Sequence, residues 1–135
     1  MRPANVLTLI SLVLALALAG CEREHVNAYG TDPGDVHAAI GPSIGRCCFE
    51  TDGDVPQVLR EALGDDAESL LDWNGSKWHV DLKAANALWL RRAGVGRVDV
   101  CGECTMCHPE RYWSHRRCGD RRGVQAAVIS LEDTL

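Results

Sequence analysis

Residues 38–50 decide the fold, and they read Ala38-Ala39-Ile40-Gly41-Pro42-Ser43-Ile44-Gly45-Arg46-Cys47-Cys48-Phe49-Glu50. The apolar run over residues 36–40 predicts a short buried strand. Two glycines and a proline then force a tight loop over residues 41–45. The backbone N–H groups of such a loop either face an anion or only turn the chain. Both interpretations place a strand-to-loop junction at Gly41.

Two helices and several strands are expected after this junction. Asp54 is expected to cap the first helix, which Gly64 ends. Asp81 is expected to cap the second, which Gly94 stops. Further strands are expected at residues 78–80, 95–101 and 124–131. Because strands and helices alternate, the sequence predicts an α+β fold, a mixed sheet with flanking helices.

Length, composition and charge narrow the class of protein. The chain has 135 residues, of which 46% are hydrophobic and 24% charged. These values predict one globular domain rather than a disordered chain. The formal net charge of -5 gives no general attraction to nucleic acid, so no nucleic-acid partner is expected.

The first residues resemble an export signal. An uncharged run over residues 6–19 is too short to span a hydrocarbon core of about 30 Å, and it ends in Leu18-Ala19-Gly20-Cys21, which looks like a bacterial lipobox. We therefore expect a signal peptide over residues 1–20, lipidation of Cys21 and a linker over 21–35. The product would be a lipoprotein anchored to the membrane on its exported side. Alternatively the start is a gene-model artefact, and the protein is cytoplasmic.

The chain has seven cysteines. In an exported protein they suggest disulfides, and in a cytosolic one they suggest metal binding or catalysis. Cys104-Thr105-Met106-Cys107-His108 matches the haem-attachment pattern, so a lipid-anchored haem protein is one interpretation. Metal binding is another, with Cys101, Cys104, Cys107 and His108 as candidates, or zinc held by Cys101, Cys104, Cys107 and Cys118. The third, which we rank first, is buried thiols that act as small hydrophobes. Cys47 and Cys48 are interpreted as structural, because adjacent cysteines do not readily bridge each other.

A basic loop near the C-terminus is a candidate anion site. Five arginines lie within twelve residues: Arg111, Arg116, Arg117, Arg121 and Arg122. A planar guanidinium grips phosphate through two hydrogen bonds. Arg116 and Arg117 are the candidate phosphate ligands, and Arg121 and Arg122 are interpreted as solvated charges.

Three stretches, taken in order and spacing, resemble the YfiH/laccase-domain family. Residues 38–50 are similar to its A-x-G-P-x-I-G-x-C-C-[YF]-E signature, and residues 80–86 to its D-L-x-x-A-N helix start. Residues 104–117 resemble C-T-x-C-x-P-E-x-[FY]-[FYW]-S-[YH]-R-R. The likeness runs from about residue 29 to residue 131 and corresponds to the C-terminal half of the family's domain, here residues 36–135.

The resemblance implies an α+β fold and a purine-nucleoside activity. That activity is phosphorolysis of adenosine, inosine or methylthioadenosine, together with adenosine deamination, so a purine nucleoside and phosphate are the implied partners. Zinc is the implied cofactor, with copper in older descriptions of these proteins as polyphenol oxidases or laccases. In bacteria the family is also linked to peptidoglycan editing.

The chain departs from the family pattern at the metal site. The family's two histidines and one cysteine lie in V-H-G, A-D-C-x-P and H-A-G-W-R-G motifs, none of which occurs in these 135 residues. His37 lacks the A-G-W-R-G context and receives no ligand role. The family's R-R-D-G also becomes Arg116-Arg117-Cys118-Gly119. We therefore expect the chain alone to be inactive, to bind no zinc of the family type, and to self-associate through exposed core surface.

Overall fold

Two separate sheets carry the strands in the computed structural model, which describes residues 30–128. Strand β1 (His37–Ile40) pairs in parallel with β5 (Arg97–Val100), four residues against four. The second sheet is antiparallel, in the order β2-β4-β3. Its strands are β2 (Glu50–Thr51), β3 (Leu71–Trp73) and β4 (Trp78–Val80). Parallel and antiparallel pairing in one chain confirms the predicted α+β class.

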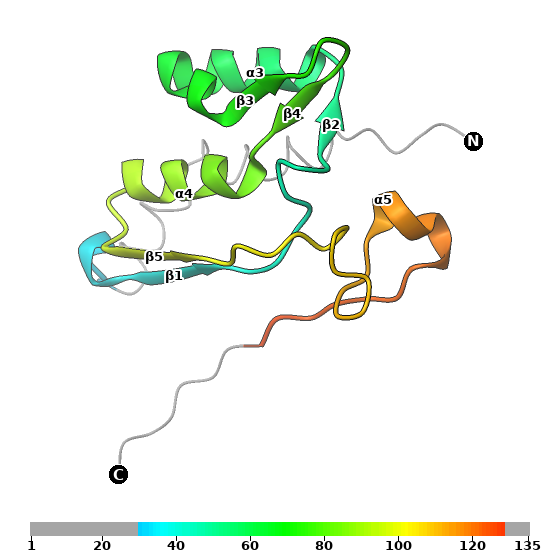
Figure 1. Ribbon diagram of the computed structural model, residues 1–135. Coiled ribbons are helices and arrows are strands. Elements are labelled where there is room, and N and C mark those ends of the chain that lie inside the picture. The colour runs from blue at the N-terminus through cyan, green and yellow to red at the C-terminus, as the bar shows by residue number, and fades with distance from the viewer. Residues whose placement is uncertain (1–29, 129–135) are drawn as a thin grey trace.

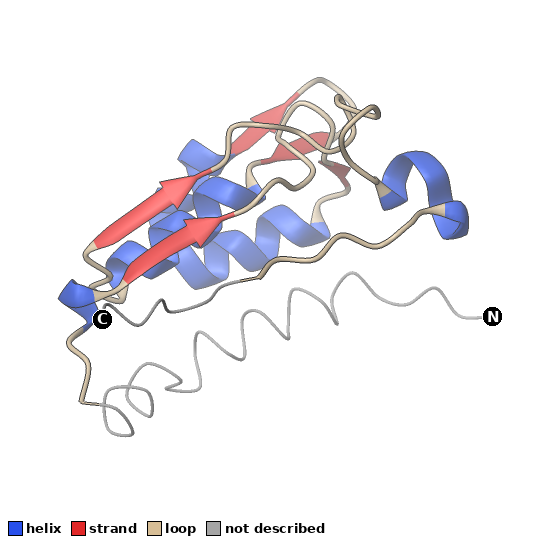
Figure 2. Ribbon diagram, turned by 90° about the horizontal axis from the view of Figure 1, so that it is seen from below, coloured by secondary structure: helices blue, strands red, loops and turns tan. Residues whose placement is uncertain are grey.

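Helix α4 (Leu82–Arg92) lies between the two sheets (Figure 1). Helix α3 (Asp54–Leu63) covers the antiparallel sheet, and a 3₁₀ segment, η2 (Gly64–Leu70), continues directly from it. A short helix, α5 (His115–Cys118), lies beyond the carboxyl end of β5. Figure 2, seen from below, shows β1 and β5 in front with the helices behind them. Within residues 30–128, no helix is long and apolar enough to cross a membrane.

The core sits where α3, η2, α4 and the antiparallel sheet meet. On α3, Val55, Leu59 and Leu63 recur every four residues and are at most 6% exposed. This spacing places one apolar stripe against the sheet. The buried cluster is completed by Phe49, Ala67, Leu70, Leu71, Val80 and Ala85. Phe49 is one of these buried residues, and it directly follows Cys47 and Cys48 in the chain. Its burial therefore fixes the position of the turn that carries the two cysteines.

The two predicted helices are confirmed, although one predicted cap is wrong. The side chain of Asp81 accepts a hydrogen bond of 2.9 Å from the backbone N–H of Ala84, as an N-cap does. Asp54 is not a cap: it is already the first helical residue, Gly53 takes the N-cap position, and no side chain caps this end. The Asp54 carboxylate instead lies in the first turn, where a negative charge favours the helix dipole.

Two of the expected later strands are present, and one is wrong over its described part. The strand at 78–80 is confirmed, and the one expected over 95–101 is present as β5. Residues 124–128 form no strand, and Val124 and Val128 are each 93% exposed. An apolar segment forms a strand only where a partner strand is in reach, and this segment pairs with none among residues 30–128.

Residues 30–40 also differ from the expected linker and buried strand. The expected buried strand, β1, alternates exposed and half-buried residues. Within the expected linker, Pro33–Asp35 form a 3₁₀ turn, η1, that Asp32 caps by accepting a 2.7 Å bond from the Gly34 N–H. The expected signal peptide and the lipidation of Cys21 lie outside the described residues.

Candidate functional site

The parallel pair β1–β5 brings two loops together at its carboxyl end. The Cys101 N–H donates to the Ile40 carbonyl at 2.9 Å, and the Thr105 N–H donates to the Ser43 carbonyl at 3.0 Å. An isolated parallel bridge between Ser43 and Cys104 continues the parallel pairing beyond the strands, with the register shifted by one residue. Loops that follow neighbouring parallel strands leave the sheet at the same edge. The loop over residues 41–49, here the glycine-rich loop, therefore runs beside the loop over residues 101–114, here the cysteine-rich loop.

Four thiols meet where these loops lie side by side. The Sγ atoms of Cys47, Cys48, Cys104 and Cys107 all lie within 4.8 Å of one another. Cys107 Sγ is 3.6 Å from Cys47 Sγ and 3.5 Å from Cys48 Sγ. Cys104 is buried at 6% exposure, whereas Cys47 and Cys107 are exposed. We call this group the four-cysteine cluster; it is open to solvent on one side.

Local turns hold each half of the cluster. The Phe49 and Cys48 N–H groups donate to the Gly45 carbonyl at 2.9 and 3.0 Å. The Cys107 and His108 N–H groups donate to the Cys104 carbonyl at 3.1 and 3.2 Å. The two turns present both cysteines of each pair to the same space.

A side chain at Gly45 would be crowded by the cluster. A Cβ at this position would lie 3.2 Å from Cys104 Cβ and 3.4 Å from Cys47 Sγ. The Gly45 N–H also donates to Cys104 Sγ at 3.2 Å. The tight loop was expected either to face an anion or only to turn the chain. One of its backbone N–H groups, that of Gly45, instead donates to the sulfur of Cys104 in the same chain.

The cluster holds unequal thiols. Burial opposes ionisation of Cys104, but hydrogen bonds from the backbone of Gly45, Cys107 and Met106 outweigh it and lower the pKa of Cys104 from 9.0 to about 6. Burial, then thiol contacts within the group, raises the pKa of Cys48. Burial likewise raises the pKa of Cys47. Near neutral pH the expected state is a Cys104 thiolate beside protonated Cys47 and Cys48.

The lowered pKa of Cys104 predicts that one thiol of the cluster titrates below the ordinary thiol range. In reduced protein with a chelator present, the ultraviolet absorbance of thiolate is expected to rise with a pKa of about 6, well below the ordinary 9.0. Because the folded-state pKa is lowered, the thiolate stabilises the fold fully above pH 9 and loses this contribution as the pH falls through about 6. Cys104→Ser should abolish the step and Cys101→Ser should keep it. A wild-type titration with no step below the ordinary thiol range would contradict the prediction.

The structure brings together a different cysteine set from those the sequence suggested. Of the sequence candidates, Cys104 and Cys107 belong to the cluster, whereas Cys101, Cys118 and His108 are outside it. Cys47 and Cys48, which we interpreted as structural, complete it. The sequence carried part of the signal, because two adjacent cysteines and a C-x-x-C pair each follow a predicted strand. That these two strands pair in parallel comes from the structure.

Cys104 and His108, two residues of the haem-attachment pattern, both contact other protein groups. Cys104 Sγ is buried and already accepts the Gly45 N–H. His108 Nδ1 lies 3.2 Å from the Glu110 carboxylate and 3.1 Å from an Arg111 guanidinium nitrogen. The Cys104 sulfur and His108 Nδ1 are thus engaged by protein groups, and haem attachment stays an untested prediction.

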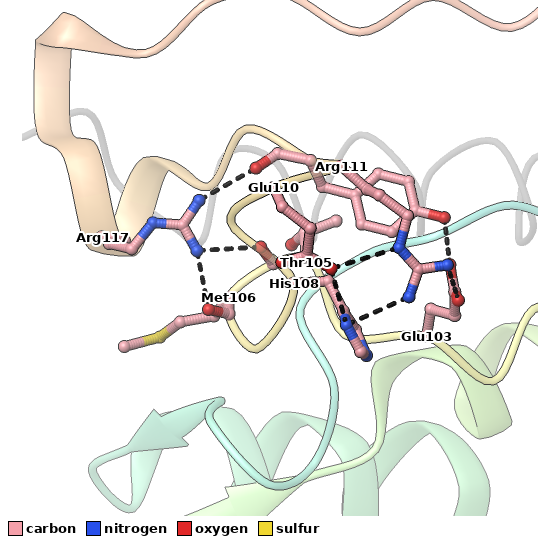
Figure 3. A network of polar contacts seen from close by, with 8 residues as sticks. Glu103, Thr105, Met106, His108, Glu110, Arg111 and Arg117 are labelled. Atoms are coloured by element: carbon pink, nitrogen blue, oxygen red, sulfur yellow. Dashed lines mark hydrogen bonds and ion pairs between the residues drawn. The ribbon is translucent and has the colours of Figure 1, made fainter.

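Arg117 holds the cysteine-rich loop together. Its guanidinium donates to the carbonyls of Met106 at 2.7 Å, Tyr112 at 2.9 Å and Thr105 at 3.3 Å (Figure 3). These three carbonyls come from both ends of the loop. Arg117, one of the two candidate phosphate ligands, thus spends its donors on the backbone.

Arg116, the other candidate, has a different environment. Two of its guanidinium nitrogens donate to one acceptor, the Glu50 carbonyl, at 3.1 and 3.3 Å. The group also lies over the Phe49 ring, 5.5 Å from its centroid, and the residue is exposed. Because a guanidinium carries five N–H donors, Arg116 keeps donors for an anion. Arg121 and Arg122 are exposed, as expected of solvated charges.

A second ionic network fixes the outer side of the same loop. Glu103 binds both Arg111 and the Tyr112 hydroxyl, and Arg111 Nε also reaches Glu110 at 3.3 Å (Figure 3). The Tyr112 hydroxyl, followed by Arg111, lowers the pKa of Glu103. Arg111 is therefore engaged by carboxylates of its own loop.

The sequence motifs and this fold identify the family. The sequence model of the family described as "Multi-copper polyphenol oxidoreductase laccase" matches residues 16–132. The chain belongs to this family. The named relatives include purine nucleoside phosphorylase YlmD of Geobacillus stearothermophilus, 38% identical over 116 residues. Another is purine nucleoside phosphorylase YlmD of Bacillus subtilis, 32% identical over 107 residues. The resemblance inferred from the three motifs is thus confirmed.

Solved structures of the family share the fold. The crystal structure of the hypothetical protein YfiH from Bacillus licheniformis superposes with a TM-score of 0.68 at 30% identity and covers 76% of this chain. That of YlmD from Geobacillus stearothermophilus gives 0.67 at 34% identity. This chain spans about 40% of each of these two proteins, and also 40% of the first curated relative.

Proposed function

We propose that this chain forms the C-terminal part of a purine nucleoside phosphorylase of the laccase-domain type. When the rest of the domain is present, the substrates of the complete enzyme are a purine nucleoside and phosphate. The observation that carries the proposal is the alignment with the phosphorylase YlmD over 82% of this chain, at 38% identity. Adenosine deamination is the second activity to be tested.

Arg116 is the residue of this chain that best suits phosphate. It is exposed and keeps N–H donors beyond those given to Glu50. Arginine is favoured where phosphate is gripped through two bonds. Arg117 acts as a positioning residue, because its bonds to three carbonyls hold the loop that leads into α5.

The residues present do not fit the metal site that the family implies. The motifs that carry its two histidines and one cysteine are absent from the sequence. Among residues 30–128, His37 Nε2 contacts Asp99 at 2.7 Å, and no histidine joins the four-cysteine cluster. No catalytic step is therefore assigned to zinc or copper in this chain.

The chain alone is inactive in this proposal. A catalytic zinc needs roughly three protein ligands and an open position. Arginines that hold phosphate bind the ground state and the transition state alike, and such binding does not raise kcat. Activity requires the remaining part of the domain, whether from a longer form of this protein or from another chain.

A chimera tests the proposal. Residues 36–135 replace the matching C-terminal part of Geobacillus stearothermophilus YlmD, and this chain alone is assayed beside it. Adenosine, inosine and methylthioadenosine are supplied with phosphate, and free base and inosine are measured by chromatography. We expect base release from the chimera and none from the chain alone. Arg116→Ala in the chimera should raise KM for phosphate, because a ground-state contact is lost.

Two results would contradict the proposal. The first is a folded chimera that releases no base while YlmD itself does. The second is base release by the chain alone that disappears in Arg116→Ala, since the C-terminal part would then suffice. Arg121→Ala is the matched control: this exposed arginine lies in the short 3₁₀ helix that follows α5, and its loss is expected to leave kcat and KM unchanged.

A further inference from the structure

We propose that the four-cysteine cluster binds one zinc ion as a tetrahedral tetrathiolate, which joins the loop after β1 to the loop after β5. The site stands apart from the proposed nucleoside activity and does not rest on it. Each loop contributes a pair of ligands: Cys47 and Cys48 from one, Cys104 and Cys107 from the other.

The sulfur positions suit a tetrahedron. Zinc–sulfur bonds of about 2.3 Å require neighbouring sulfurs about 3.8 Å apart. Cys107 Sγ is already 3.6 Å from Cys47 Sγ and 3.5 Å from Cys48 Sγ, and all four sulfurs lie within 4.8 Å. Bringing the widest pairs to tetrahedral spacing takes shifts of about one ångström, which side-chain rotation provides.

The donor set selects the ion. Four thiols with no carboxylate or imidazole in the group favour zinc and other thiophilic ions over magnesium or calcium. Four protein ligands fill a zinc coordination sphere, as in structural rather than catalytic sites. The site is therefore assigned a role in stability, with no open position for substrate.

Supporting contacts hold the ligands in place before the ion arrives. The Gly45 N–H donates to Cys104 Sγ at 3.2 Å, the kind of contact that orients a metal ligand. Gly45 packs closely against Cys104 and Cys47, so a side chain at this position would press on both ligands. The exposed positions of Cys47 and Cys107 provide an entry path for the ion.

A disulfide is the competing use of the same thiols. Cys107 is close enough to pair with Cys47 or with Cys48 after a small movement, and an oxidising compartment would favour this. The two outcomes are exclusive at Cys107, because a disulfide sulfur is no longer a thiolate ligand. The test must therefore separate metal binding from oxidation.

Cobalt titration of the reduced, chelator-treated full chain provides the readout. One Co²⁺ per chain is expected, with thiolate-to-cobalt charge-transfer absorption and the intense visible bands of tetrahedral cobalt. Zinc should abolish these bands. Cys107→Ser removes a direct ligand and should weaken binding at least as much as the roughly 10–100-fold that loss of an outer-shell partner costs. Cys101→Ser and Cys118→Ser, which remove cysteines outside the cluster, should bind as the wild type does.

Controls keep the result interpretable. Circular dichroism checks that each variant folds, and Cys47→Ser, at an exposed position, is the second variant should Cys107→Ser unfold. Cobalt bands that persist in both variants, or that vanish in Cys101→Ser, would overturn the site. Reduced protein that binds no cobalt, while air-purified protein carries a Cys107 disulfide, would overturn it in favour of a redox pair. No nucleoside is needed, so this result is independent of the chimera assay.

Discussion

Replacing Leu59 by alanine is expected to lower the free energy of unfolding by about 2–5 kcal/mol. Leu59 is 2% exposed and lies in the middle of the α3 stripe, between Val55 and Leu63. Removing its side chain loses buried apolar surface and leaves a cavity that α3 and the antiparallel sheet cannot close without moving. Denaturant unfolding followed by circular dichroism measures the change.

Glu61→Ala on the same helix is the matched control. Glu61 is exposed, and its carboxylate accepts a 2.9 Å hydrogen bond from the Gln57 side chain. An exposed pair of this kind contributes little, so this variant should stay within about 0.5 kcal/mol of the wild type. If Leu59→Ala and Glu61→Ala had equal effects, α3 would not pack as described.

The fold was readable from sequence where local signals agree. At α4, the Asp81 cap, the apolar spacing and Gly94 all mark the same helix, and the structure has it at Leu82–Arg92. The short strands β2 and β3 were not predicted, because two or three residues rarely show a periodicity, although the equally short β4 was predicted at residues 78–80. Their existence depends on pairing with β4, a tertiary contact that no local pattern reports.

The strand predicted at 124–128 is absent because a local apolar pattern is present there without a partner strand. Its apolar residues suggest a strand, yet Val124 and Val128 are almost fully exposed. A strand is stabilised by hydrogen bonds and side-chain pairs from its neighbour, so local composition is not sufficient. Relatives of this chain extend well beyond the part that it matches.

The candidate site was only half predicted. The C-x-x-C spacing correctly drew attention to Cys104 and Cys107, but spacing along the chain suggested Cys101, Cys118 and His108 as their companions. The actual companions, Cys47 and Cys48, lie almost sixty residues away in sequence. Only the parallel register of Ile40 with Val100 places them there, and sequence patterns do not specify which strands pair.

Arg117→Ala is expected to cost about 2–3 kcal/mol in the free energy of unfolding. The half-buried guanidinium donates to the carbonyls of Thr105, Met106 and Tyr112, and alanine would leave these acceptors without their charged donor. Because the bonds join both ends of the cysteine-rich loop, hydrogen exchange at the Cys107, His108 and Tyr112 amides should also accelerate.

The neighbouring Arg116 separates this role from a general effect of lost charge. Arg116→Ala removes the same charge but only the contacts to the Glu50 carbonyl and the Phe49 ring, so a loss below about 1.5 kcal/mol is expected. Arg117→Lys keeps the charge without the planar fork and should fall between Arg117→Ala and the wild type. Equal losses in Arg116→Ala and Arg117→Ala, with unchanged amide exchange in the loop, would show that Arg117 does not organise it.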